Sequence, residues 1–177
     1  MQQRREIEAE PGLGEGALVR LAAEVAGVRT PDGGLAPPER LGFGLVRARG
    51  RDDVLVQWVD ADVDTWAPRA DVQPLGADQR LLTVWRCDQQ GRRTLLRRAP
   101  VRLDHHWRVD LLPTGLVRAV REDGPCWTFA FNTLTREVDP HWGEELDDDA
   151  AEAIVAADLA MRPPPAGRRP FWRFWAS

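Results

Sequence analysis

Residues 41–75 read LGFGLVRARGRDDVLVQWVDADVDTWAPRADVQPL and carry the clearest strand pattern in the chain. Val54, Val56 and Trp58 occupy alternate positions in a run that is rich in β-branched residues. This period of two is typical of a β-strand with one face against a core. We therefore expect Trp58 to be a core residue.

The residues on either side complete a set of short strands. Residues 44–49 alternate small or apolar side chains with arginines, and the turn-forming residues 50–53 join them to the next strand in a hairpin. A turn at residues 60–62 leads into a third strand at residues 63–67, which Pro68 ends because proline cannot donate a ladder hydrogen bond. Short, bent strands usually close into a small barrel, so we expect a mainly β protein with an N-terminal small barrel.

Residues 56–75, VQWVDADVDTWAPRADVQPL, are similar to the end of a Tudor domain, in which a strand, an Asp-containing turn, a short strand and a closing turn follow one another. The resemblance extends over residues 17–76 at the level of the SH3-like barrel superfamily, and it implies an SH3/Tudor-like barrel. Tudor domains that read methylated side chains place aromatic residues after the Asp of the turn, whereas positions 61–63 hold Ala, Asp and Val. Phe43 and Trp66 remain as the expected partner-binding residues of the barrel.

The segments that precede this stretch are less regular. Residues 1–16 are polar and charged, and we expect them to form a flexible N-terminus. Residues 17–22 alternate in the manner of a first barrel strand. The connection at residues 24–40 is long for a hairpin loop. It is either a tolerated surface insertion or, as in SH3-like barrels, a border of the ligand groove.

The second half of the chain shows a further series of short strands separated by turn residues. The predicted strands are residues 81–87, 93–103, 107–112, 116–121, 126–131 and 136–138. We expect residues 80–143 to form a second small sheet, an antiparallel β meander. Its turns faintly resemble those of a WW domain over residues 112–142. Because Leu116 stands where the first WW tryptophan belongs, we do not assign proline-peptide binding.

One helix is predicted, at residues 147–162. Three aspartates open it and Arg162 closes it, an arrangement that suits the helix dipole. Its apolar stripe consists of Ala151, Ile154, Val155 and Leu159. We expect this amphipathic helix to pack on the second sheet.

Composition limits the classes of function. The net charge is −4, so the chain as a whole does not attract nucleic acid or acidic membranes. Lysine and tyrosine are absent, which indicates a GC-rich bacterial genome and makes the arginine content a weak sign of phosphate binding. The sequence shows neither a secretory signal nor a long apolar run. We expect a cytoplasmic protein in which Cys87 and Cys126 stay reduced and lie buried in strands.

Five arginines form the densest basic cluster of the chain. They are Arg92, Arg93, Arg97, Arg98 and Arg102. The cluster is either an anion-binding site that meets phosphate groups or a solvated and internally paired surface, since the residues in and before the predicted helix are strongly acidic.

Asp104-His105-His106 follows an apolar strand, as the Asp-His-His motif does in a family of metal-dependent phosphoesterases. The resemblance implies a metal-dependent hydrolase as an alternative function. That family has an α/β fold, whereas the segments before Asp104 predict strands. No motif pairs a serine or cysteine nucleophile with a base. We therefore expect a protein that is not an enzyme and that needs neither cofactor nor metal.

Residues 163–177 form a tail rich in proline, arginine and aromatic residues. Its expected partner-binding residues are Phe171, Trp172, Arg173, Phe174 and Trp175. Tryptophan and arginine dominate binding hot spots, so one expectation is that the tail enters a groove of a partner. The alternatives are that its aromatic side chains fold back on the protein's own sheet or lie at a membrane surface.

The leading hypothesis is a non-catalytic adaptor that docks on a protein partner. The Tudor-like resemblance implies the transcription machinery or other nucleic-acid machinery as the setting, with RNA polymerase as one candidate partner. Besides the hydrolase, the alternative is nucleic-acid binding through the five arginines.

Overall fold

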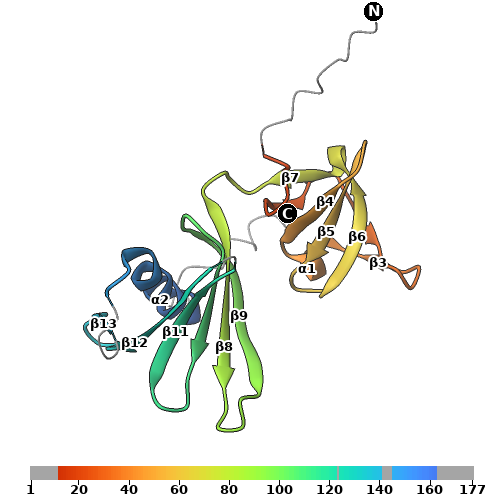
Figure 1. The fold of residues 1–177 in the computed structure, drawn as a ribbon. Helices are drawn as coiled ribbons and strands as arrows, with labels where there is room; N and C mark the ends of the chain where they lie inside the picture. Colours follow the sequence, from red (N-terminus) through yellow and green to blue (C-terminus); the bar gives the residue numbers. More distant parts are fainter. Residues whose placement is uncertain (1–11, 123, 141–144, 163–177) are drawn as a thin grey trace, which may run out of the picture. The chain divides into compact units, whose positions relative to one another are not determined.

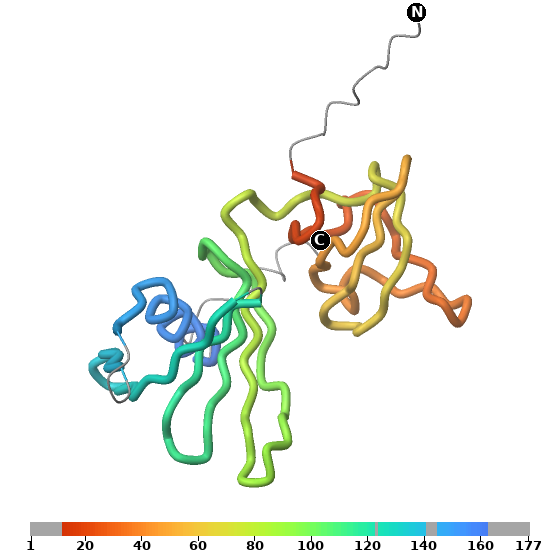
Figure 2. Tube along the Cα trace, in the orientation of Figure 1, coloured from red at the N-terminus to blue at the C-terminus, as the bar shows by residue number. Residues whose placement is uncertain are grey.

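The computed structural model describes residues 12–122, 124–140 and 145–162. These residues form three sheets, and the predicted mainly β class is confirmed (Figures 1 and 2). They divide into two compact units. Unit 1 lies within Met1–Leu81 and Pro100–Asp104, and unit 2 lies within Leu82–Ala99 and His105–Ser177.

Unit 1 contains a five-stranded antiparallel sheet with the order β6-β5-β4-β1-β7. Its strands are β1 (Leu18–Leu21), β4 (Gly44–Arg49), β5 (Asp53–Trp58), β6 (Val63–Pro68) and β7 (Val72–Pro74). A 3₁₀ turn, η1 (Arg69–Asp71), leads from β6 to β7, and β7 pairs with β1. Within the described residues, the edge strands β6 and β7 do not pair with each other, so the sheet is open rather than a closed barrel.

The connection between β1 and β4, predicted as a long loop, carries structure of its own. It contains β2 (Val28–Arg29), β3 (Leu35–Ala36) and the short helix α1 (Pro38–Leu41). Pro38 suits the first turn of a helix, because its φ is fixed and it has no N–H to leave unpaired. Gly42 ends the helix with a φ of 64°, in the left-handed region that glycine adopts readily. Leu41 is fully buried, so this connection contributes to the core of unit 1.

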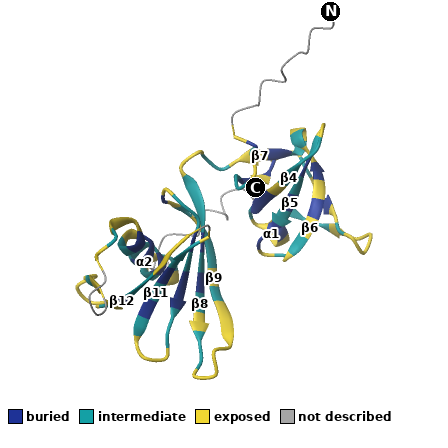
Figure 3. Ribbon diagram, in the orientation of Figure 1, coloured by how far each residue is buried: buried dark blue, intermediate teal, exposed yellow. Residues whose placement is uncertain are grey.

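Trp58 belongs to the core of unit 1, as predicted. It is fully buried in one cluster with Val54 and Val56, and buried residues alternate with more exposed ones along β5 (Figure 3). The indole Nε1–H of Trp58 donates a hydrogen bond to Oγ1 of Thr65 at 2.8 Å. The polar atom of a buried tryptophan usually finds such a partner, and here the neighbouring strand supplies it.

A six-stranded mixed sheet lies mostly in unit 2 and has the order β13-β12-β11-β10-β8-β9. Its strands are β8 (Gln79–Cys87), β9 (Arg93–Arg102), β10 (Trp107–Leu111), β11 (Leu116–Arg121), β12 (Cys126–Phe131) and β13 (Val138–Pro140). The prediction of a purely antiparallel meander is wrong, because β10 pairs with β8 in parallel. Residues 103–106 are enough to connect β9 to β10, because β9 ends beside the start of β8 and β10 begins at the same end of β8. In the strand order, β9 lies at an edge of the sheet.

The helix α2 (Asp148–Met161) packs on β10 and β11. Asp147 caps it by accepting a hydrogen bond from the Ala150 N–H at 2.8 Å. Its buried residues are Ala150, Ala153, Ile154 and Ala157. Of the predicted stripe, Ile154 is buried, Ala151 and Val155 are half-buried, and Leu159 is exposed. Alanines face the sheet because they let the helix backbone approach the strands closely.

Two further features of the described residues concern cysteines and membranes. Cys126 is exposed and Cys87 is partly exposed, so the expectation that both thiols are buried is wrong. Both lie at strand ends, Cys87 closing β8 and Cys126 opening β12. In the part of the chain that the structure describes, no helix has the length and apolar character needed to cross a membrane.

Candidate functional site

Trp66 projects from the face of the unit 1 sheet that lies opposite the core. Its neighbours on β6, Thr65 and Ala67, are buried on the core side, whereas Trp66 is 53% exposed. The strand register places Trp66 beside Leu55 of β5, which lies in turn beside Ala48 of β4. Paired residues of neighbouring strands point to the same face. The three residues therefore form an apolar row, which we call the Trp66 surface.

The Trp66 surface lies next to the turn that joins β4 to β5. A Cβ atom placed on Gly50 would lie 3.4 Å from the Trp66 ring, so the indole packs directly over the backbone of this turn. Nη2 of Arg69 in η1 donates to the Gly50 carbonyl at 2.6 Å, and the Arg69 backbone N–H donates to the Asp52 carbonyl at 3.1 Å. The turn and η1 are thus tied together beside Trp66. A surface that is ordered before binding loses less conformational entropy when a partner arrives.

Phe43, the other predicted partner-binding residue of unit 1, lies away from Trp66. Its carbonyl accepts a hydrogen bond from the Val59 N–H at 2.9 Å, beyond the C-terminal end of β5. Trp66 lies near the opposite end of β5, beside Leu55. Phe43 is also partly buried. The structure does not bring the two aromatic residues into one site.

The five predicted partner-binding residues of the tail lie outside the described residues. They are Phe171, Trp172, Arg173, Phe174 and Trp175.

The five predicted anion-binding arginines are distributed along and beside β9, and three of them lie against carboxylates. Nε of Arg92 lies 2.7 Å from Oδ2 of Asp88, and Nε of Arg102 lies 3.1 Å from Oδ2 of Asp78. Arg93 approaches Asp110 of β10. Arg97 and Arg98 are in the middle of β9, the former exposed and the latter partly buried. The cluster is therefore not a set of free cations.

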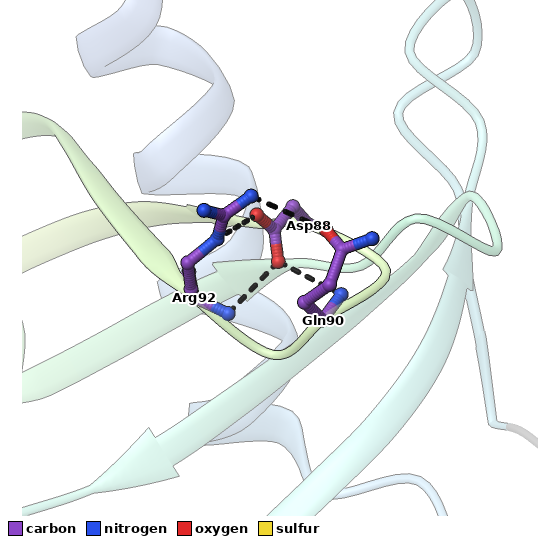
Figure 4. A network of polar contacts seen from close by, with 3 residues as sticks. All are labelled: Asp88, Gln90 and Arg92. Carbon is purple, nitrogen blue, oxygen red and sulfur yellow. Dashed lines mark hydrogen bonds and ion pairs between the residues drawn. The ribbon is translucent and has the colours of Figure 1, made fainter.

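Asp88 organises the turn between β8 and β9 (Figure 4). Its Oδ1 accepts hydrogen bonds from the backbone N–H groups of Gln90 and Arg92, each at 2.9 Å, and its Oδ2 accepts from the Arg92 guanidinium. Partial desolvation opposes ionisation of the carboxyl group. The hydrogen bonds from Arg92 and Gln90 nevertheless outweigh it and hold the pKa of Asp88 below its ordinary value. Arg92 is thus a structural residue of this turn.

The residues of the proposed metal motif do not form a metal site. In unit 1, the Asp104 carbonyl accepts a hydrogen bond from Nε of Arg80 at 3.1 Å. In unit 2, the His106 carbonyl accepts one from the Glu122 N–H at 3.3 Å, and His105 is partly exposed. Among the described residues, no group of three His, Cys, Asp or Glu side chains is arranged to hold a metal ion.

Asp110 of β10 is the polar residue that the sequence did not single out. It is fully buried, and neither carboxylate oxygen has a hydrogen-bond partner among the described residues. Nε of Arg108 lies 3.2 Å from Oδ1, and Nη2 of Arg93 lies 3.7 Å from Oδ2. The one signal in the sequence is an aspartate at a polar position of the alternating strand WRVDL, with an arginine two positions before it.

Comparison of the chain with protein-family models, with curated proteins and with solved structures finds no match.

Proposed function

We propose that the protein is a non-catalytic adaptor and that a protein partner docks on the Trp66 surface of unit 1. The observation that carries this proposal is the half-exposed indole of Trp66, which is held over the backbone of Gly50. A tryptophan side chain buries about 150–250 Å² when it is fully covered, so covering the exposed half contributes about 2–3 kcal/mol. That is the contribution of a typical binding hot spot.

The order of the elements in unit 1 supports its assignment to the SH3-like barrels of the Tudor-like type. A long, structured connection follows the first strand, a tight turn joins β4 to β5, and η1 precedes the last strand, which pairs with the first. Binding residues often lie on loops that a rigid scaffold positions, and a partner that docks beside the β4–β5 turn and η1 would use this arrangement. With this assignment, RNA polymerase and other transcription proteins are the first partners to test.

The alternative functions have less support. Three of the five arginines proposed for nucleic-acid binding lie against carboxylates, so the five do not form a cluster of free cations. For the hydrolase, the described residues of the Asp-His-His motif contribute backbone carbonyls to the fold and not a cluster of metal ligands.

The experiment uses the full chain as bait in an extract of its own cells, and the retained protein is then purified and titrated by calorimetry. We expect Trp66→Ser to weaken its affinity by roughly 30-fold, because a hot-spot tryptophan contributes about 2 kcal/mol. Both proteins keep residues 163–177, so the comparison isolates Trp66 from the aromatic tail.

Leu134→Ser is the matched control, because Leu134 is a large apolar residue that is 92% exposed in a turn of unit 2. It should bind the partner as tightly as the native chain. Circular dichroism verifies that both variants are folded. The proposal is wrong if no partner is retained, or if Trp66→Ser and Leu134→Ser bind it equally well.

A further inference from the structure

The two faces of the unit 2 sheet differ in character. On the face against which α2 packs, the strands present a continuous set of buried apolar residues, namely Leu82, Val84, Trp107, Val109, Val117 and Ala119. The opposite face has Asp110 at its centre. The strand register places Trp85 of β8 on one side of Asp110 and Arg118 of β11 on the other. A charged residue therefore occupies the middle of the face that the helix leaves uncovered.

A buried aspartate is costly unless its charge is compensated and its oxygens accept hydrogen bonds. Arg93 and Arg108 supply the compensating charge, but neither oxygen of Asp110 accepts a hydrogen bond within the described part of the chain. The Nε atom of Arg108 is likewise buried without a hydrogen-bond partner. These residues are thus held together by charge, while both Asp110 oxygens and Arg108 Nε lack hydrogen-bond partners among the described residues. A core that needed only stability would be served as well by apolar side chains.

The arginines around Asp110 outnumber it. Side-chain exposure is 44% for Arg93 and 34% for Arg108, so both side chains remain partly accessible to solvent. Arg118 lies directly across from Asp110, and among the described residues its side chain has no hydrogen-bond or ion-pair partner. Three guanidinium groups against one carboxylate leave two positive charges uncompensated. A ligand that carries two negative charges, and several acceptor oxygens, would match them.

Trp85 indicates what else the ligand carries. It is partly exposed on β8, in register with Asp110 and on the same face. Thr83 lies two positions before it, in register with Arg108. An indole beside a set of arginines offers a stacking surface for a planar ring, and the threonine hydroxyl offers a hydrogen bond.

We infer that this face binds a phosphate monoester that bears a planar ring, with the chemistry of a nucleoside monophosphate. Arg93, Arg108 and Arg118 hold the phosphate, and Trp85 stacks against the ring. Asp110 is a positioning residue: it holds Arg93 and Arg108 beside each other, which their mutual repulsion would otherwise oppose. This site lies in unit 2 and is independent of partner docking on unit 1.

The test is calorimetric titration of the full chain with adenosine monophosphate, inorganic phosphate and adenosine. We expect saturable binding of the monophosphate, weaker binding of inorganic phosphate, and little binding of adenosine. Arg118→Gln should weaken monophosphate affinity at least tenfold. Trp85→Leu should remove the advantage of the monophosphate over inorganic phosphate and leave phosphate binding in place.

Arg86→Gln is the control, because Arg86 is an exposed arginine of β8 that alternates with Trp85 and points to the other face. It should bind like the native chain. The inference is overturned if the monophosphate does not bind saturably at millimolar concentration, or if Arg86→Gln weakens binding as much as Arg118→Gln.

A second measurement needs no variant and so does not depend on whether one folds. Phenylglyoxal modifies accessible arginines, and mass spectrometry reads the extent at each position. Monophosphate should slow the modification of Arg118 and leave that of Arg86 unchanged. Equal rates at Arg118 with and without the ligand would overturn the inference.

Discussion

Trp58 and Trp66 lie on the two strands of one hairpin in unit 1 and face opposite ways. The first is fully buried and the second is half exposed. Thr65 connects them: it precedes Trp66 in the chain, and its hydroxyl accepts the hydrogen bond from the Trp58 indole. The buried Trp58–Thr65 hydrogen bond thus holds β6, the strand from which Trp66 projects, against β5.

Thr65→Val should destabilise unit 1. The substitution keeps the shape of the side chain but leaves the buried Nε1–H of Trp58 without a partner, which costs about 1–3 kcal/mol. Chemical denaturation followed by tryptophan fluorescence measures the free energy of unfolding. Thr94→Val, at an exposed position of β9, serves as the control and should change it little. If both variants are equally stable, the Trp58–Thr65 hydrogen bond does not contribute to stability.

Individual residues differ in how far the sequence predicts them. Trp58 was predicted to be buried because its position in an alternating strand decides which way it points, and alternation is a local property. Asp110 could not be recognised in this way. Its burial depends on Arg93 and Arg108 and on strands that meet only in the folded sheet. The separation of Phe43 from Trp66 could not be recognised either. It depends on the strand register, which decides where along β5 each residue lies.

The turn between β8 and β9 is an element whose stability should depend on pH. Hydrogen bonds from Arg92 and Gln90 to the Asp88 carboxylate hold its pKa below 3.8. A depressed pKa means that the ionised group stabilises the folded state at neutral pH, and that this stabilisation is lost as the pH falls through the pKa in the folded protein. Acid should therefore loosen this turn.

The test compares the native chain with Asp88→Asn. The native chain should have the larger free energy of unfolding at pH 7, and the difference should shrink as the pH falls below 3.8. Asp139→Asn, on the exposed part of β13, controls for the loss of one negative charge. A difference between the native chain and Asp88→Asn that stays constant from pH 7 into acid would contradict this role.

Among the elements, local signals predicted strand positions and the hairpins β4–β5 and β11–β12, but they did not predict a pairing outside a hairpin. β4, β11 and β12 have the predicted bounds, because alternation and turn residues mark them in the sequence. The parallel pairing of β10 with β8 was missed, since it depends on which side of the sheet the chain re-enters. The packing face of α2 was only partly predicted. The prediction weighted large apolar residues, whereas three of the four buried residues of α2 are alanines and the fourth is Ile154.

At the scale of the whole molecule, the chain should not bind duplex DNA at physiological salt. Its net charge is −4, and Arg92, Arg93 and Arg102 lie against carboxylates. Non-specific binding depends on cations that are free to replace counterions on the phosphates. Fluorescence anisotropy with a labelled duplex measures the affinity at several salt concentrations. Tight binding that falls steeply with salt would reinstate the nucleic-acid alternative.

The edge strands of the two larger sheets share one property. Each contains a proline: Pro68 in β6, Pro74 in β7, Pro100 in β9 and Pro140 in β13. The strands between them contain none. A proline cannot donate the hydrogen bond that an added strand would need, so it protects an edge against further pairing. Another copy of the chain, or an extended peptide, therefore cannot readily lengthen either sheet, and recognition is left to side chains on the faces.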